Sequence, residues 1–111
     1  SNVIMPAVVR RGDLNIAIST GGASPALARR LRERLETLIG PEYAGLAELL
    51  ADLRPVLLEN FAPGEPRRRA ALRLVDLSLE AVVRDQGAEA ARRQALDLLE
   101  DLARDDDEIS R

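Results

Sequence analysis

Residues 19–25 carry the side chains and backbone groups best suited to chemistry in this chain. They read Ser19-Thr20-Gly21-Gly22-Ala23-Ser24-Pro25. Ser24 is a good helix N-cap, and Pro25 suits the first helical position. Backbone N–H groups and the positive end of a helix dipole would then point at one spot, which favours an anion. The same residues also fit a capped strand-to-helix turn without a ligand, and taken alone they leave both interpretations open.

The run Arg67-Arg68-Arg69 is a second candidate site. The planar fork of arginine binds carboxylates through two parallel hydrogen bonds, so the run could contact a carboxylate-rich ligand. Basic charge at the start of a helix is mildly unfavourable with the helix dipole, which favours this functional interpretation. The alternative is a solvated charged turn, because runs of charge usually face water.

Several kinds of chemistry are excluded by composition. The chain has no cysteine and no histidine, so disulfides, thiol chemistry and the usual zinc, haem and iron–sulfur sites are not expected. Its formal net charge is −3, and only Tyr43 and Phe61 could stack on bases, which argues against nucleic acid as a partner. No apolar run reaches the roughly 18 residues that span a membrane, and no secretory leader is visible, so we expect a cytoplasmic protein.

The first 18 residues predict a β-hairpin that would position the candidate loop. Val3–Val9 is rich in β-branched residues, Leu14–Ile18 alternates, and Arg10–Asp13 supplies turn residues between them. Pro6 cannot donate a ladder hydrogen bond, so its strand should lie at a sheet edge. Two strands alone are marginally stable, and we therefore expect the hairpin to need a partner.

The remainder predicts about four helices, which gives an α+β fold. Their expected ranges are 25–39, 42–61, 66–84 and 88–104, with Pro55 kinking or splitting the second near Arg54. The predicted inward-facing residues follow helical spacing: Leu27, Leu31, Leu35 and Leu38; Tyr43, Leu46, Leu50, Leu53 and Leu57; Ala71, Leu74, Val75 and Val82; Ala91, Ala95, Leu98, Leu99 and Leu102. Residues 1–40 would form one region, 41–104 a helical domain, and 105–111 a frayed acidic tail.

Three stretches of this sequence closely resemble the precorrin-2 dehydrogenase family, the N-terminal module of siroheme synthases. They are Asn2-Val3-Ile4-Met5-Pro6-Ala7-Val8-Val9-Arg10-Arg11-Gly12-Asp13-Leu14, Ile16-Ala17-Ile18-Ser19-Thr20-Gly21-Gly22-Ala23-Ser24-Pro25, and Leu27-Ala28-Arg29 with Leu31-Arg32. The resemblance is dense over about the first 39 residues and continues more loosely through Phe61 and the arginine run.

The resemblance implies an enzyme of siroheme biosynthesis that oxidises precorrin-2 to sirohydrochlorin with NAD, and some members of the family also insert ferrous iron. It implies that this chain is the dimerisation region plus the helical domain, paired in a homodimer through the hairpin and first helix. The NAD-binding Rossmann domain is missing, since no Gly-x-Gly-x-x-Gly fingerprint follows a strand. The fragment alone should therefore be inactive, with no catalytic, cofactor-binding or metal residues of its own.

The resemblance also assigns part of the site. Ser19 and Thr20 match hydroxyls that line the tetrapyrrole cleft, and Gly21 and Gly22 match the turn beside it. We assign Ser24 to capping, because serine at this position is by default an N-cap. The arginine run 67–69 is a further candidate for contact with the carboxylates of the substrate. The alternative is a free-standing helical dimerisation or interaction module without a catalytic role, and a third possibility is a chelatase-only protein, which no carboxylate cluster with ligand spacing supports.

Overall fold

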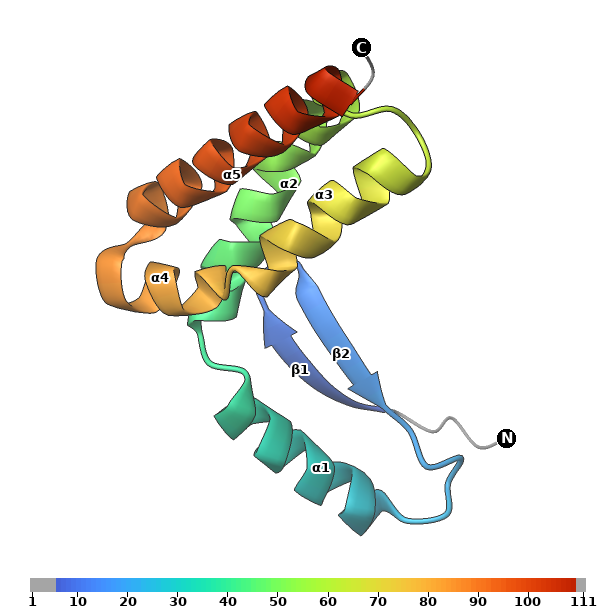
Figure 1. The fold of residues 1–111 in the computed structure, drawn as a ribbon. Helices are drawn as coiled ribbons and strands as arrows, with labels where there is room; N and C mark the ends of the chain where they lie inside the picture. Colours follow the sequence, from blue (N-terminus) through green and yellow to red (C-terminus); the bar gives the residue numbers. More distant parts are fainter. Residues whose placement is uncertain (1–5, 110–111) are drawn as a thin grey trace.

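The computed structural model describes residues 6–109, with side chains described as far as Asp105. A two-stranded hairpin is followed by five helices (Figure 1), which confirms the α+β prediction. The elements are β1 (Ala7–Arg11), β2 (Leu14–Ile18), α1 (Pro25–Leu38), α2 (Glu42–Asn60), α3 (Glu65–Asp76), α4 (Leu79–Gln86) and α5 (Ala88–Ile109). None of the helices in this described part is long and apolar enough to cross a membrane.

The hairpin is antiparallel, with Arg11 opposite Leu14 and Val9 opposite Ile16. Gly12 takes a φ of 60°, while Asp13 has no positive φ, as in a type II′ turn with glycine at its first central position. The second strand matches its predicted bounds. The first begins only at Ala7, just after Pro6, and the earlier part of the predicted strand, residues 3–5, lies outside the described residues.

Helix α1 begins as the sequence predicts. Ser24 has an extended φ of −155°, and its hydroxyl accepts a hydrogen bond from the Leu27 N–H at 3.1 Å, with Pro25 at the first helical position. The predicted inward face is partly wrong, because Leu27 and Leu38 are 51% and 73% exposed. Among the described elements only the hairpin covers this helix, so burial centres on Ala28 and reaches Leu27 and Leu38 only at the margins of the contact.

The main hydrophobic core lies among α2, α3, α4 and α5. Its buried residues are Leu49, Leu53, Phe61, Ala70, Leu74, Leu79, Ala91, Ala95 and Leu99. The predicted face of α5 is confirmed. On α3 the prediction is confirmed for Leu74, which is buried, but wrong for Ala71 and Val75, which are exposed, and it missed the buried Ala70.

The predicted second helix is confirmed, as α2 runs unbroken to Asn60, and of the two effects predicted for Pro55 a split is excluded. Proline has no N–H, so the carbonyl of Ala51, four residues before Pro55, has no helical hydrogen bond to accept. Ala51 and Pro55 both face solvent, where water can donate to that carbonyl. The predicted third helix is instead two helices, α3 and α4, separated at Ser78, which adopts a left-handed conformation with a φ of 53°.

The break at Ser78 turns the chain so that α4 packs on α2 (Figure 1). The approach is close: a Cβ added to Gly45 would lie 3.0 Å from Val83 Cγ1. Helix α5 continues past the predicted end at Arg104 to Ile109, so the backbone from Asp105 is helical, whereas a frayed tail was predicted there.

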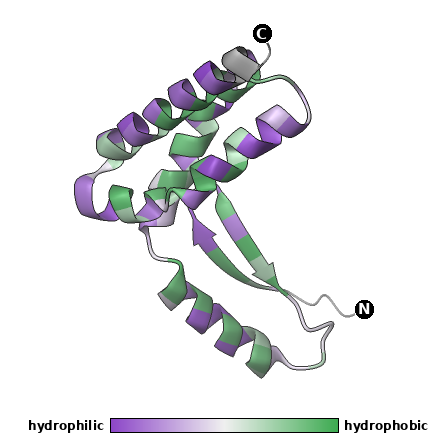
Figure 2. Ribbon diagram, in the orientation of Figure 1, coloured by the Kyte–Doolittle hydropathy of each residue, from purple (hydrophilic) through white to green (hydrophobic). Residues whose placement is uncertain are grey.

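The molecule is elongated, with extents of 60 × 32 × 18 Å and a radius of gyration of 17.9 Å. A compact chain of this length would have a radius of about 13 Å. The hairpin and α1 form a lobe that projects from the helical bundle (Figure 1), and among the described residues this lobe buries only Val9 and Ala28 fully. Figure 2 shows that β2 is mostly hydrophobic, although it forms part of this thin lobe.

Candidate functional site in the loop before helix α1

The loop between β2 and α1 is shaped by its own hydroxyl groups. Thr20 Oγ1 accepts from the Ser24 N–H at 3.0 Å and donates to the Ser24 carbonyl at 3.3 Å. Ser19 Oγ accepts from the Gly21 N–H at 3.2 Å. The Thr20 hydroxyl proton is therefore committed inside the loop, whereas exposed Ser19 keeps its proton to donate to a ligand.

The two glycines of the loop meet a backbone requirement. Gly21 and Gly22 have φ values of 66° and 83°, a region that residues with a Cβ rarely adopt. A Cβ added to Gly21 would have no neighbour within 4 Å, so the space beside this glycine is open. The turn is closed by the Ala23 N–H donating to the Thr20 carbonyl at 3.2 Å.

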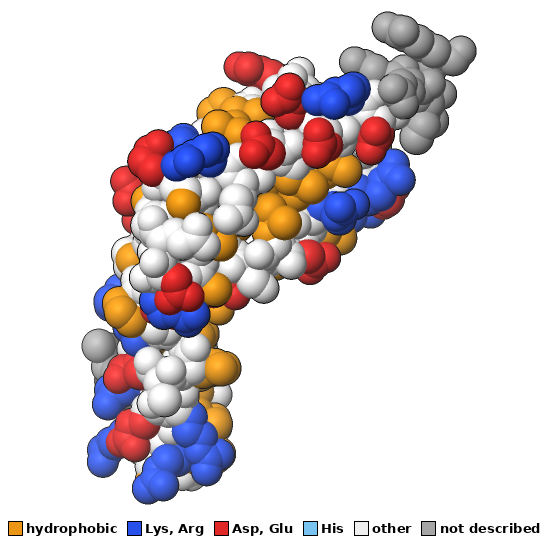
Figure 3. All heavy atoms as spheres, turned by 60° about the vertical axis from the view of Figure 1, so that its left-hand side comes forward, with side chains coloured by type: hydrophobic (Ala, Val, Ile, Leu, Met, Phe, Trp, Pro, Cys, Tyr) orange, Lys and Arg blue, Asp and Glu red, His pale blue; other side chains and the backbone are white. Residues whose placement is uncertain are grey.

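The surroundings of the loop are electropositive. It leads into the N-terminus of α1, whose first turn contains no acidic residue. Exposed arginines 29, 30 and 34 follow on the same helix, and Figure 3 shows arginine side chains gathered at this end of the molecule. Acidic side chains are present on both lobes (Figure 3), but the acids of α1, Glu33 and Glu36, follow its first turn and pair with Arg30 and Arg32. The loop end therefore remains favourable for an anion.

The three arginines of the run 67–69 have different surroundings. Arg67 donates to the Leu58 and Phe61 carbonyls at 3.2 and 3.0 Å, which caps the end of α2. Arg68 pairs with Glu65 one turn earlier. Arg69 is exposed and borders a groove of about 420 Å³ between α3 and α5. Of the three, Arg69 is therefore the one placed at a concave surface.

The loop and the arginine run do not meet within one chain. The loop lies at the far end of the projecting lobe, and the start of α3 lies at the opposite end of the molecule (Figure 1). No loop residue lines the groove beside Arg69. A single chain therefore does not bring the two groups of residues proposed to bind substrate into one site.

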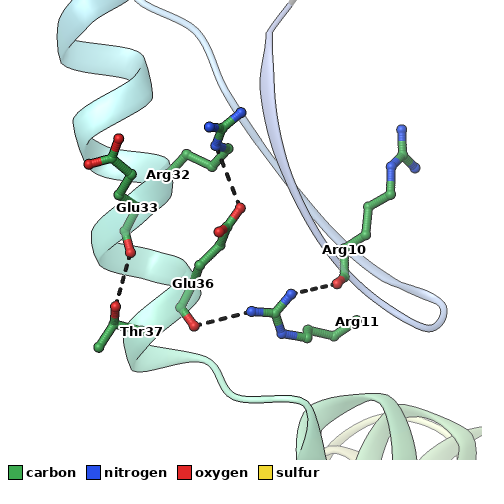
Figure 4. A network of polar contacts seen from close by, with 6 residues as sticks. All are labelled: Arg10, Arg11, Arg32, Glu33, Glu36 and Thr37. Atoms are coloured by element: carbon green, nitrogen blue, oxygen red, sulfur yellow. Dashed lines mark hydrogen bonds and ion pairs between the residues drawn. The ribbon is translucent and has the colours of Figure 1, made fainter.

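Arg11 has a role that the sequence did not reveal. Its guanidinium donates to the Glu36 carbonyl at 3.1 Å and the Arg10 carbonyl at 2.8 Å (Figure 4). It also donates to the Ile39 carbonyl at 2.8 Å. The last turn of α1 has no basic residue, so Arg11 supplies the cation that the negative end of this helix favours. The only sequence signal was two adjacent arginines before a turn, which did not indicate a distant partner.

A surface ion pair away from the loop, Arg84 with Asp85, changes the pKa of both its members. Arg84 donates to both carboxylate oxygens of Asp85, at 2.9 and 3.2 Å. This hydrogen bond lowers the pKa of the Asp85 carboxyl and raises that of Arg84. Both groups are exposed at the end of α4, and the pair gives the loop no acid or base.

The segment that contains Arg11, the loop and α1 matches a known family. Residues 11–38 match the family described as "Sirohaem biosynthesis protein central". A siroheme synthase of Methylococcus capsulatus is 41% identical over 105 residues, and one of Pseudoalteromonas translucida is 36% identical over 106 residues. These alignments cover 91% and 96% of this chain, but only 21% and 22% of the relatives.

A solved structure agrees with these relatives. "SirC, precorrin-2 dehydrogenase" matches 91% of this chain at 29% sequence identity with a TM-score of 0.57, and the match covers 48% of that protein. This chain is similar to one segment of siroheme synthases and of a precorrin-2 dehydrogenase. The predicted resemblance is thus confirmed. The segment spans about a fifth of the two synthases and about half of the solved dehydrogenase.

Proposed function

We propose that this segment of the siroheme synthase family supplies one wall of the tetrapyrrole cleft and the dimer interface of an NAD-dependent precorrin-2 dehydrogenase. The observation that supports the proposal is the loop before α1, which lies within residues 11–38, the stretch that matches the sirohaem biosynthesis family. Its glycines leave the backbone open, Ser19 retains a proton to donate, and the α1 N-terminus is electropositive. These features suit the carboxylates of a polycarboxylate tetrapyrrole.

NAD does not fit the residues of this chain. The Gly21-Gly22 turn follows a strand and precedes a helix, as a dinucleotide fingerprint would. However, β2 belongs to a two-stranded antiparallel hairpin rather than a parallel βαβ unit, and no third glycine opens α1. The proposal therefore places NAD on another part of the full-length protein, and the segment alone is expected to be inactive.

The role proposed for this chain's own groups is binding and orientation. The Ser19 hydroxyl would donate to a substrate carboxylate beside the positive end of the α1 dipole, which fixes the macrocycle relative to the group that accepts hydride. Because hydrogen bonds within the loop and the cap of α1 hold the loop in one shape, this donor is positioned before substrate arrives. Arg69 could contact a carboxylate only where a second chain or domain brings the substrate to it.

The test uses the full-length protein that contains this segment. Purified enzyme is given precorrin-2 and NAD⁺, and formation of NADH and sirohydrochlorin is followed by absorbance. We expect turnover by the full-length enzyme and none by residues 1–111 alone. A Ser19→Ala variant should raise KM for precorrin-2 with a smaller change in kcat. A full-length protein that folds and binds NAD⁺ but does not oxidise precorrin-2 would contradict the proposal.

A further inference from the structure

A groove between α3 and α5 is open to solvent on the helical bundle. It has a volume of about 420 Å³, and the apolar side chains that line it are Phe61, Pro66, Ala70, Leu72 and Leu102. Phe61 and Ala70 are buried members of the core, whereas Leu72 is 56% exposed. The floor of the groove therefore belongs to the bundle, and one of its walls is uncovered.

The exposed apolar surface continues along α3 beyond the groove. Val75 lies one turn from Leu72 and is 61% exposed. A single exposed hydrophobic side chain is ordinary, but a contiguous apolar patch with charged residues at its edge marks an interaction site. Leu72 and Val75 together with the groove form such a patch.

The length and shape of the groove fit a helix. Its lining residues on α3 run from Pro66 to Asp76, which at 1.5 Å per residue is about 15 Å, or about three turns. In helical bundles, the groove between two neighbouring helices is filled by side chains of a third helix. A small molecule is normally enclosed over most of its surface, and the exposed wall at Leu72 does not provide such an enclosure.

Charged side chains of both signs border the groove. Arg69 and Arg73 lie one turn apart on the α3 wall, and Asp76 follows one turn later. Asp105 borders the groove from α5. A complementary helix would carry two acidic residues one turn apart opposite the arginines, and basic residues opposite the aspartates. This two-sided pattern specifies the helix more narrowly than an apolar groove alone would.

We infer that the groove docks an amphipathic helix from the remainder of the full-length protein, which lies outside these 111 residues. The segment spans 21% and 22% of the two synthases and 48% of the solved dehydrogenase, so about half or more of each relative lies outside it. A helix on the same polypeptide has an effective concentration of up to about millimolar, so it occupies the groove ahead of a separate protein.

The inference goes beyond the proposed function and requires only that the segment belongs to a longer protein. The start of α3 lies at the opposite end of the molecule from the loop before α1 (Figure 1). A helix docked there would hold the bundle against the rest of the protein while leaving the loop uncovered. Arg69 would then bind a carboxylate of that helix.

Thiol labelling of the full-length protein measures whether the groove is covered. Leu72→Cys places a thiol on the groove, and Leu58→Cys is the matched control on α2, where Leu58 is 45% exposed and does not line the groove. Reaction with a maleimide is followed by peptide mass spectrometry, and each rate is divided by the rate in urea-unfolded protein. We expect Leu72→Cys to react about tenfold or more slowly than Leu58→Cys. A rate for Leu72→Cys close to its unfolded rate would overturn the inference.

Charge reversal tests the recognition of the helix. Arg69→Glu combined with Arg73→Glu reverses the α3 wall, and Arg68→Glu is the matched control, because Arg68 pairs with Glu65 and does not line the groove. In the Leu72→Cys protein, the double variant should raise the labelling rate about tenfold and the control should leave it unchanged. Circular dichroism checks folding, and Arg69→Gln replaces the double variant where that variant does not fold. Equal labelling rates in variant and control would contradict docking by charge.

Photocrosslinking identifies the occupant of the groove. With p-benzoylphenylalanine in place of Leu72, we expect a cross-link within one polypeptide, to a peptide that carries two acidic residues one turn apart. A product of twice the mass would assign the groove to a second copy, and a failure to cross-link would leave it empty; either result overturns the inference. A protein that cross-links as expected but does not oxidise precorrin-2 would instead contradict the proposed function alone.

Discussion

At the scale of the residue, two neighbouring hydroxyls in the loop before α1 have separate duties. Thr20 makes two hydrogen bonds with Ser24 inside the loop, and Ser19 accepts one from Gly21 and remains exposed. The resemblance implies that both line a cleft. The hydrogen bonds give Thr20 a further role in the shape of the loop and leave Ser19 as the better donor to a ligand.

This division predicts different effects for two conservative variants. Thr20→Val keeps the shape of the side chain but loses both hydrogen bonds to Ser24, and it should lower the free energy of unfolding by about 1–3 kcal/mol. Ser19→Ala should change it by less than about 1 kcal/mol and act on substrate binding instead. Urea denaturation measures the first effect and steady-state kinetics of the full-length enzyme the second. Equal destabilisation by both variants would contradict the division.

At the scale of the element, Arg11 joins the hairpin to the end of α1. Arg11→Ala removes three hydrogen bonds to carbonyls and should cost about 1–3 kcal/mol of unfolding free energy. Arg11→Lys should recover only part of this, because an ammonium cannot reproduce the planar fork. Arg10→Ala is the matched control: the Arg10 side chain is exposed and, among the residues that the structure describes, bonds only Asn15, at 3.3 Å, so its loss should cost under about 0.5 kcal/mol. Equal stability of the Arg11→Ala and Arg10→Ala variants would show that the cap is unimportant.

The junction between α3 and α4 gives a second prediction at this scale. Ser78 adopts a φ of 53°, and its side chain makes no capping hydrogen bond. A left-handed conformation costs a residue with a Cβ about 1–2 kcal/mol, which glycine avoids. Ser78→Gly should therefore stabilise the chain by up to about 1 kcal/mol, after the larger entropy of glycine in the unfolded state is counted. Thermal unfolding tests this, and Ser78→Ala, which should not stabilise, is the control.

The elements that the sequence predicted well are those whose signals lie within a few neighbouring residues. The bounds of β2 follow from its alternation, and the start of α1 from Ser24 and Pro25, because strand pattern and helix capping act within a few residues. The break at Ser78 and the roles of Arg11 and Arg67 could not be predicted in this way. Each depends on an element that packs nearby only after folding, such as α2 against α4 at Gly45 and Val83. The chemical type of the arginines was visible in the sequence, but not which carbonyls they would find.

At the scale of the whole molecule, stability is divided unevenly between two lobes. The bundle has nine buried residues in one cluster, whereas the hairpin and α1 fully bury only Val9 and Ala28 among the described residues. Leu27 and Leu38 remain largely exposed on α1, as expected for a lobe that is completed by other surfaces. A lobe with so little buried apolar area should open locally before the bundle unfolds.

This unevenness predicts a concentration-dependent pattern of hydrogen exchange. At concentrations where the chain is monomeric, amides of β2 and α1 should exchange at least about tenfold faster than those in the middle of α5, because local opening of a thin lobe costs less free energy than global unfolding. Under the proposed dimerisation through this lobe, raising the concentration should slow exchange in β2 and along α1, because association removes the open state by mass action. Amides near Ala95 in α5, at the centre of the bundle, should be unaffected by concentration and serve as the internal control. Uniform protection across both lobes at high dilution would show that the hairpin and α1 are stable without a partner, and would remove the physical reason for placing the dimer there.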